Sequence, residues 1–533
     1  MNIHAVSGIL YGMDISALTT TNDIEKLRTM ALAMVQKAMS ENAEKERELQ
    51  AKKQRIQLLE EMLKLVRQQR FGKKCETLAG MQRSLFEEDV DADIAALTAQ
   101  LDKLLPSPAE EDDKAPRSRP VRKPLPSHLP RVEKVIPSAA DHCPECNEPL
   151  HHIRDAVSEK LEYIPARFVV NRYVRPQYSC PCCQKVFSGE MPAHILPKSA
   201  VEPSVIAQVV INKYCDHLPL YRQNNIFARA DVGLPESSLS GMVGVAGAAL
   251  SPLAELLHRE LLTRGVIHAD ETGMRILDTK KGGKSRSGYL WVYVSGERSG
   301  SRIVCFDCQT GRGHEHPENW LQDWSGTLVV DGYQAYRTLA GKVPGIILAG
   351  CWSHARRGFA DLYKMNKEPR AALAVKKIAG LYRLEKKISS RPVEKIRQWR
   401  QRYARPILEE LWSWLEEQEQ RCPPGGALHK AIVYTLARRV ELGLFLEDGA
   451  VPLDNNLCER AIKTVVMGRK SWLFAGSRMA GERAARIMSL LETAKLNGLE
   501  PHAWLTDVLN RLPSWPEDRL DEFLPLPGFT FSA

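Results

Sequence analysis

Three acidic residues that lie far apart in the chain constrain its fold more than any other feature. Asp270 follows the apolar run 266–269, Asp331 follows the apolar run 327–330, and Glu459 stands in a polar stretch much further on. Apolar runs of this length are typical of buried strands. Carboxylates at such positions can together hold two Mg²⁺ ions. The arrangement therefore indicates phosphodiester chemistry on DNA.

The apolar patterns around these acids predict the order of strands and helices. Strands are expected at 266–269, 289–294, 302–306, 327–330 and 346–348. Three consecutive strands, followed by strands that alternate with helices, fit a ribonuclease H-like mixed sheet. In such a sheet Asp270, at the end of the first strand, and Asp331, just beyond the fourth, are neighbours. Asp454 or Asn455 then caps a helix that carries Glu459.

Each acid also has a plain structural interpretation. Asp270 competes with its neighbour Glu271 for the catalytic role. Asp331 precedes a glycine and suits a turn, and Glu459 can pair with Lys463 one helical turn later. The strand pattern favours the metal site for all three together.

The twelve cysteines are unevenly distributed, and two close pairs predict a zinc site in a reducing compartment. We expect a structural Zn²⁺ with four thiolate ligands, Cys143, Cys146, Cys180 and Cys183. Cys182 is interpreted as a bystander that can substitute for a neighbour. A third pair, Cys305 and Cys308, falls in a predicted strand, where residues three apart face opposite sides, so no second site is expected there.

Residues from about 41 to 69 follow a heptad pattern, with Leu49, Ile56 and Leu63 seven positions apart. Lys52 interrupts one core position. The pattern predicts a coiled-coil helix. Pairing of two chains into a homo-oligomer and an internal helical hairpin are both open.

Between about 106 and 137, prolines alternate with basic residues, a composition that cannot form a packed core. The basic residues of this stretch include Arg117, Arg119, Arg122 and Lys123. In an extended chain they can neutralise DNA phosphates without reading bases. A plain linker explains the composition equally well.

Residues 204–262 have helical patterns, with a turn at Gly233 and Pro235 and a helix entered through Ser237 or Ser238. Helix, glycine turn and serine-capped helix resemble a DNA-binding helix-turn-helix. Basic side chains are few in this stretch, so ordinary helical packing is an equal alternative.

Further basic and aromatic residues are expected to hold DNA near the cut. These residues are His354, Arg356, Arg357, Arg460, Lys463, Arg469, Lys470 and Trp472. The sequence is consistent with four roles for His354 and the two arginines after it: phosphate binding, support of the third acid, helix capping and surface charge. For Trp472, core packing is the stronger alternative.

Length, charge and hydropathy set outer limits. The chain has 533 residues, enough for several domains, and its net charge of +9 favours an anionic partner. We find no signal-peptide pattern at the amino terminus and no run of about 18 apolar residues. A cytoplasmic protein that associates with the nucleoid when bound to DNA, without a membrane partner, is expected.

Several short motifs follow one another along the chain. They are Arg70-Phe71-Gly72, the two cysteine pairs, 213–223, Asp270-Glu271-Thr272, 351–357 and 468–474. In number and order these motifs resemble transposases of the insertion sequence 66 family over nearly the whole chain. Cys458 stands where a smaller residue such as alanine is more usual in that family.

The resemblance implies a DDE-type transposase whose acidic triad is Asp270, Asp331 and Glu459. Such an enzyme nicks the ends of its element to give 3′ hydroxyls and joins them to target DNA, with two Mg²⁺ or Mn²⁺ ions as cofactors. The resemblance also implies two small accessory proteins. A metal-dependent nuclease or resolvase of the same fold, and an inactive DNA-binding regulator, are the alternatives.

The presence of all three acids argues against a regulator, and the additional modules argue against a minimal nuclease. We therefore predict a multidomain α/β protein with eight segments. They are an N-terminal helical region (1–105), a linker (106–137), a zinc module (138–195), a helical region (196–262), the sheet core in two parts (263–365 and 451–500), a helical insertion (366–450) between them, and a tail (501–533).

Overall fold

A computed structural model describes residues 168–179, 186–197, 199–278, 284–298 and 300–532, with isolated positions between 32 and 45. The predicted linker and both cysteine pairs lie outside these residues, as does the heptad region except for Lys45. The chain divides into two units. The smaller one contains a short antiparallel hairpin of β1 (Gln177–Ser179) and β2 (Val186–Ser188). The larger one contains the central sheet and the helices around it.

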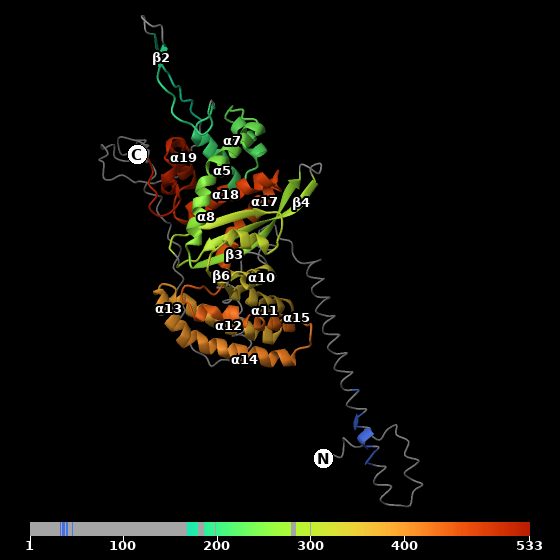
Figure 1. Cartoon of the computed structure of the whole chain (residues 1–533). Coiled ribbons are helices and arrows are strands. Elements are labelled where there is room, and N and C mark those ends of the chain that lie inside the picture. Colours follow the sequence, from blue (N-terminus) through green and yellow to red (C-terminus); the bar gives the residue numbers. More distant parts are fainter. Residues whose placement is uncertain are drawn as a thin grey trace, which may run out of the picture. The chain divides into compact units, whose positions relative to one another are not determined.

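The central sheet has five strands in the order β5-β4-β3-β6-β7 (Figure 1). The strands are β3 (Val266–Asp278), β4 (Lys284–Ser295), β5 (Val304–Gln309), β6 (Gly326–Val330) and β7 (Ile346–Gly350). The first three form an antiparallel meander, β6 runs parallel to β3, and β7 runs parallel to β6. The predicted mixed α/β architecture and all five predicted strands are therefore confirmed.

The expected end of the first strand at Asp270 was wrong. β3 continues to Asp278, because its residues from Asp270 onward keep pairing with β4 in a long hairpin. The first four residues of β3 and most of β6 appear in the sequence as short, largely apolar runs because helices cover both faces of the sheet. On one face, α17 (Asn456–Trp472) and α18 (Arg478–Leu496) pack against β3, β4 and β5.

The outer edge of the sheet is closed by side chains of α18. β5 is an edge strand, so alternate backbone N–H groups point away from β4. The N–H of Val304 donates to Thr493 Oγ1 over 3.0 Å, and that of Phe306 donates to Ser489 Oγ over 2.8 Å. Both hydroxyls are buried, so this edge cannot pair with another chain. The pair Cys305 and Cys308 lies in β5, as predicted, and both thiols are buried.

The helices before the sheet are α5 (Pro203–Tyr214), α6 (Leu220–Ala228), α7 (Glu236–Ala249) and α8 (Ser251–Leu262). α7 begins at Glu236, slightly before the predicted Ser237 or Ser238. After α18 the chain ends in α19 (Pro501–Arg511), which packs against α5, and in short 3-10 turns. In the described part of the chain, no single helix is long and apolar enough to cross a membrane. α7 and α8 meet these criteria only when they are taken together, and this pair is bent by 46°.

α9 (Glu315–Leu321) and α10 (Gln334–Lys342) lie between sheet strands. α11 (Trp352–Asn366) follows the last strand. A group of helices then separates α11 from α17. They are α12 (Pro369–Ile388), α13 (Val393–Trp399), α14 (Arg405–Arg421), α15 (Ala427–Leu436) and α16 (Arg439–Gly443), with a π-helical turn at Arg400–Ala404.

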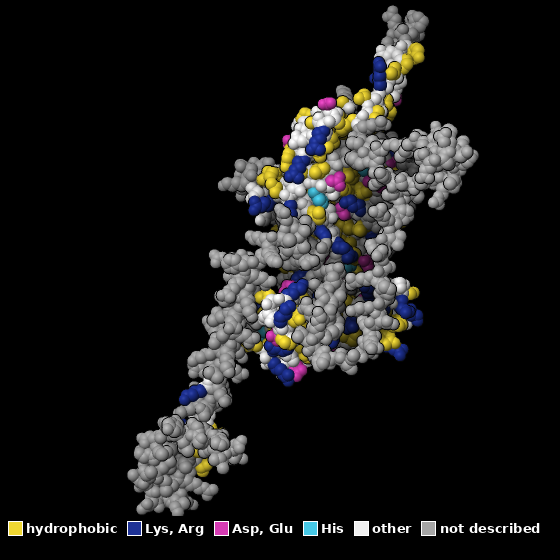
Figure 2. Space-filling model, turned by 180° about the vertical axis from the view of Figure 1, so that it is seen from behind, with side chains coloured by type: hydrophobic (Ala, Val, Ile, Leu, Met, Phe, Trp, Pro, Cys, Tyr) yellow, Lys and Arg dark blue, Asp and Glu magenta, His cyan; other side chains and the backbone are white. Residues whose placement is uncertain are grey.

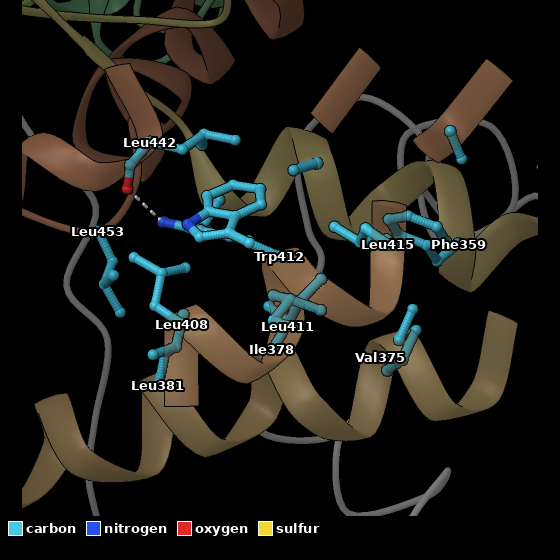
Figure 3. Close-up of a cluster of buried hydrophobic side chains, with 14 of the residues drawn as sticks. Phe359, Val375, Ile378, Leu381, Leu408, Leu411, Trp412, Leu415, Leu442 and Leu453 are labelled. Atoms are coloured by element: carbon cyan, nitrogen blue, oxygen red, sulfur yellow. Dashed lines mark hydrogen bonds between the residues drawn. The ribbon is translucent and has the colours of Figure 1, made fainter. Parts of the chain in front are cut away.

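These helices share one hydrophobic core with the sheet. Phe359 of α11, Ile378 of α12 and Trp412 of α14 are buried in one cluster (Figure 3), which also includes Val329 of β6 and Ala349 of β7. The cluster is thus continuous from the sheet into the helices. Burial of large aromatic and aliphatic side chains contributes about 1.5–3 kcal/mol each.

One buried arginine bonds to the segment that connects the helical group with α17. Arg400 is fully buried and forms a bidentate ion pair with Glu385, at 2.7 and 2.8 Å. Its guanidinium also donates to the carbonyl oxygens of Phe445, Asp448 and Val451, at 2.8–2.9 Å. One side chain thus bonds three carbonyl groups of the segment that leads into α17.

Candidate active site

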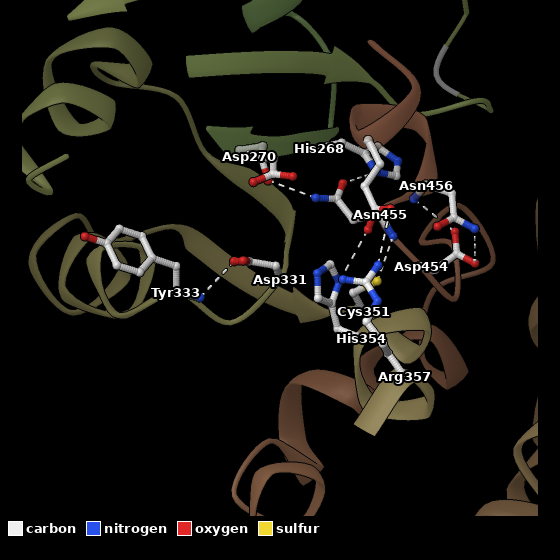
Figure 4. A network of polar contacts seen from close by, with 12 residues as sticks. His268, Asp270, Asp331, Tyr333, Cys351, His354, Arg357, Asp454, Asn455 and Asn456 are labelled. Atoms are coloured by element: carbon white, nitrogen blue, oxygen red, sulfur yellow. Dashed lines mark hydrogen bonds and ion pairs between the residues drawn. The ribbon is translucent and has the colours of Figure 1, made fainter. Parts of the chain in front are cut away.

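Asp270 and Asp331 lie at the same level on neighbouring strands. β3 and β6 are parallel, with His268 opposite Val329, and two further residues along each strand bring Asp270 level with Asp331. Asp331 directly follows β6, as predicted. Both residues are half-buried. Figure 4 shows their side chains near each other. The sheet thus brings together two carboxylates from distant parts of the sequence.

The N-terminus of α17 is fastened to the same part of β3. Asn455 is fully buried just before the helix, and its amide donates to the carbonyl oxygen of Ala269 over 2.9 Å. Its side-chain oxygen accepts from Nδ1 of His268 over 2.9 Å. One turn later, the Cys458 thiol donates to the carbonyl oxygen of Val292, the β4 residue opposite Asp270. α17 therefore begins directly over Asp270.

Glu459 follows in the first turn of α17 and is only 6% exposed. Its carboxylate faces α11, where Nδ1 of His354 lies 3.5 Å from Oε1 and the guanidinium of Arg357 lies 3.7 Å from Oε2. His354 and Arg357 are one turn apart and so share a face of α11. Two of the predicted DNA contacts therefore support the third acid.

Glu271 has a different environment from Asp270. Adjacent residues of a strand point to opposite faces, so the two side chains diverge. Glu271 accepts from Nε of Arg312 over 2.7 Å and from the Tyr336 hydroxyl over 2.9 Å. The ring of Tyr333 lies 3.8 Å below the guanidinium of Arg312. Glu271 thus belongs to a separate hydrogen-bond network, with Arg312 and Tyr336, on the other face of the sheet.

The loop that carries Asp331 is held by α15 and its C-terminal end. The Tyr434 hydroxyl donates to the carbonyl oxygen of Asp331 over 2.6 Å, and Arg438 donates to that of Gly332 over 3.1 Å. Gly332 has φ of +92°, which favours glycine. The Asp331 carboxylate also accepts from the Tyr333 N–H over 2.9 Å, so the turn interpretation holds as well.

The electrostatics are those of crowded negative charge. Burial raises the pKa of Asp270 well above its usual range, and the charges of Asp331, Glu271 and Glu459 add to the effect. Burial, with the charge of Arg357, lowers the pKa of His354 to about 4. His354 is therefore neutral near pH 7. A cation between the carboxylates would relieve their repulsion.

A second group of possible metal ligands shares Glu459 with the three carboxylates. The Cys351 thiol, His354 and Glu459 offer ligand atoms that lie within 4.8 Å of one another. Burial holds the pKa of the Cys351 thiol well above its usual range, and the thiolate is the form that binds metals. The oxygen ligands of the acids are the better match for a hard divalent cation.

The other predicted DNA contacts occupy varied positions on α11 and α17. Arg460 is exposed and lies 3.9 Å from Glu297, Lys463 and Trp472 are half-buried, and Lys470 is exposed. Arg469 donates to Thr272 Oγ1 over 2.9 Å. On the face shown in Figure 2, coloured Lys and Arg side chains form several separate groups instead of one continuous patch.

Arg356 is fully buried in α11 and is not part of any exposed surface. The residues predicted for zinc binding (Cys143, Cys146, Cys180 and Cys183) and for the basic arm (Arg117, Arg119, Arg122 and Lys123) lie outside the described residues.

Several residues that shape the site were not identified from the sequence. Asn455 was considered only as a helix cap, yet its side chain bonds to β3 instead. His268 precedes Asp270 by two positions, a spacing that places both on one strand face and was an available signal. Tyr434 and Arg438 come from the helical group, where a spacing of four residues shows a shared face but not its partner.

Models of known families match most of the chain. Residues 198–483 match the family model described as "Transposase IS66 family", and residues 489–526 match "IS66 C-terminal element". Residues 140–184 match "zinc-finger binding domain of transposase IS66", which supports zinc binding. Residues 58–133 match "Transposase C of IS166 homeodomain". The matches therefore extend from the heptad region nearly to the C-terminus.

Similar proteins occur in Sinorhizobium fredii (strain NBRC 101917 / NGR234). "Uncharacterized protein y4hP" is 32% identical over 429 residues, which cover 77% of each chain. "Uncharacterized protein y4qI" is 30% identical over 530 residues, 95% of this chain and 97% of the relative. A short segment is 82% identical over 33 residues to "Uncharacterized protein YjgZ" of Escherichia coli (strain K12), covering 6% of this chain and 30% of that protein.

Proposed function

The chain belongs to the insertion sequence 66 (IS66) transposase family, and we propose that it nicks the ends of its insertion sequence and joins the resulting 3′ hydroxyls to target DNA. The observation that carries the proposal is the strand register. It sets Asp270 level with Asp331, directly beneath the start of the helix that bears Glu459. We assign these three acids as the DDE triad.

We further propose that the five-stranded sheet is a ribonuclease H-like core and that the helices from α12 to α16 are an insertion into it. The meander of three antiparallel strands, followed by two parallel strands on the other side of β3, supports this assignment. The helical group lies in sequence between the strand that precedes α11 and the helix with Glu459.

The donor set fits two divalent cations. Three carboxylates are hard oxygen ligands of the kind that Mg²⁺ or Mn²⁺ prefers. Burial raises the pKa of Asp270 most, and the neighbouring carboxylates raise it further with negative charge that a cation would offset. When bound, such ions supply stabilisation of charge on the phosphoryl group and activation of the nucleophile. Asp270, Asp331 and Glu459 would hold them.

The remaining site residues orient the acids. Asn455 fixes the start of α17 on β3, and Tyr434 fixes the main chain of Asp331. Arg357 pairs with the Glu459 carboxylate from α11, and His354, neutral near pH 7, packs beside the same carboxylate. Because these groups are in place before substrate binds, the acids need little reorganisation.

DNA contacts outside the site are part of the same proposal. We assign Arg460, Lys463, Arg469, Lys470 and Trp472 on α17 to the DNA-binding surface and leave out the buried Arg356. The basic arm, a structural Zn²⁺ on Cys143, Cys146, Cys180 and Cys183, a homo-oligomer through the heptads and the accessory proteins belong to the proposal as well.

The test combines purified protein, Mg²⁺ and accessory proteins with labelled DNA that carries the element's ends and a target plasmid. We expect 3′ nicking and joined products, both lost in Asp270→Asn and Glu459→Gln. Nicking without joining would instead indicate a metal-dependent nuclease. Binding without nicking would indicate a regulator.

A further inference from the structure

Two large apolar side chains project from the turn between α17 and α18. Leu473 is 62% exposed and Phe474 is 43% exposed. We call these two residues the 473–474 tip. An isolated exposed apolar residue is ordinary, but two adjacent ones on a short turn beside a functional site indicate an interaction surface.

The tip is held rigidly from both sides. Leu473 has φ of +63°, a strained conformation for a residue with a branched side chain. Its N–H donates to the carbonyl oxygen of Arg469 over 2.9 Å. On the other side, Ala475 exchanges two backbone hydrogen bonds with β3, to Arg275 and Leu277, at 2.8 and 2.9 Å. The exposure of the tip is therefore a property of the fold and not of a loose loop.

The tip and the acids lie along one edge of β3. β4 occupies the opposite edge over nearly the full length of the strand, so β6 and Ala475 must both pair on the remaining one. β6 ends beside Asp270, Ala475 pairs at Ile276, and Arg469 reaches Thr272 between them. Six residues of strand span roughly 20 Å, or about six base pairs of DNA.

The charges around the tip suit DNA. Lys470 is exposed in the last turn of α17, next to Arg469, and Arg275 is exposed on the strand that anchors the tip. Cations beside a rigid apolar projection are typical of proteins that insert a wedge between base pairs and contact the flanking phosphates. The acids and this surface share one edge, so one duplex can reach both.

We propose that Leu473 and Phe474 form an apolar wedge that unstacks a base step in the end DNA, about six base pairs from the cut. This inference rests on the proposed function, because the DNA substrate comes from it. Unstacking is unfavourable, and the additional protein contacts of the bent or opened duplex offset its cost.

The test scans 2-aminopurine, a base whose fluorescence rises on unstacking, through the end DNA. Full-length protein with Asp270→Asn is used, so that the DNA stays uncut. We expect a fluorescence maximum about five to seven base pairs from the scissile phosphate. In the same background, the double variant Leu473→Ala/Phe474→Ala should lose this maximum, and Val440→Ala, which removes another exposed side chain on α16, should keep it.

Nicking by the protein with its triad intact provides a second readout. The double variant should nick paired end DNA about tenfold more slowly, consistent with the 1–3 kcal/mol of a lost base–side chain stack. A mismatch at the wedge position should restore its rate. If the wild-type protein nicks but the bound Asp270→Asn complex shows no fluorescence maximum, the wedge is overturned and the proposed function stays intact.

Failure of the mismatch to restore nicking would also overturn the wedge, and would assign the tip to a protein partner. A maximum without nicking by the intact protein would support the wedge while the proposed function failed. Thermal melting of each variant checks folding, which the substitution of exposed side chains should leave unchanged.

Discussion

The side-chain amide of Asn455 donates a 2.9 Å hydrogen bond to the carbonyl oxygen of Ala269, the residue that precedes Asp270. A single buried side chain thus sets the start of α17 against the strand of the first acid. Because Glu459 lies four residues further along the helix, its distance from Asp270 depends on this bond. This amide therefore helps to position two acids that are far apart in sequence.

Asn455→Ala should weaken both stability and nicking. The substitution leaves buried polar groups of Ala269 and His268 without their partner, which costs about 1–3 kcal/mol per group. Urea unfolding should show a loss of this size, and nicking should fall further than the lost folded fraction explains. Asn456→Ala is the control, since that side chain bonds to the neighbouring Asp454 and to no strand of the sheet among the described residues. Equal effects of the two substitutions would contradict the positioning role.

Arg400→Met should destabilise the protein strongly. Removal of the guanidinium leaves Glu385 unpaired and three carbonyl oxygens without a donor. Breaking a buried ion pair in this way costs about 3–5 kcal/mol. Arg405→Met is the matched control, because the Arg405–Glu447 pair is exposed and worth about 0–1 kcal/mol. Chemical denaturation would measure both losses of stability, and similar losses would contradict the stabilising role of Arg400.

The sheet could be predicted from the sequence because its strands are buried on both faces and therefore appear as short apolar runs. The runs that precede Asp270 and Asp331 located both acids correctly at neighbouring strands. The length of β3 could not be predicted in this way. Beyond Asp270 the strand carries polar and charged residues, and only its pairing with β4 makes it a strand.

The supports of the site were harder to predict for a different reason. Tyr434 and Arg438 belong to the helical group, and a helical pattern shows which residues share a face but not which distant loop they contact. The buried position of Arg356 was also missed, because arginine next to a site suggests DNA contact, whereas its helix face turns inward. Long-range contacts of this kind arise from tertiary packing.

Stability should fall as the pH drops below about 6.5, in part through His258. Burial lowers the pKa of this histidine, whose Nε2 bonds to the carbonyl oxygen of Trp320 over 3.0 Å, while Arg259 adds to the decrease. The unfolded chain then binds the proton more readily, so this contribution is complete above pH 6.5 and is lost on acidification. His258→Gln, which retains a donor, should reduce the pH slope of unfolding, and an unchanged slope would argue against this assignment.

Zinc should be bound by four of the five clustered cysteines. The match to a zinc-binding domain supports the ion, and thiolate binding contributes folding energy to a small module. Metal analysis of the purified protein should give one equivalent of zinc, which is reduced in Cys143→Ser and retained in Cys182→Ser. Loss of zinc in Cys182→Ser with retention in Cys183→Ser would exchange the roles of these two residues.

Asp270 and Glu271 should respond differently to the loss of charge. Asp270→Asn removes an oxygen ligand from the proposed cation site, and because such ions supply several kcal/mol of stabilisation, nicking should fall by about 100-fold or more. Glu271→Gln keeps its bond with Tyr336 and disturbs only the ion pair with Arg312, so nicking should stay within about tenfold of the wild type. Assays over a range of Mg²⁺ concentrations would measure both rate and metal dependence. If Glu271→Gln abolished nicking while Asp270→Asn retained it, the metal ligand would be Glu271, and the strand face assigned to the site would have to be reversed.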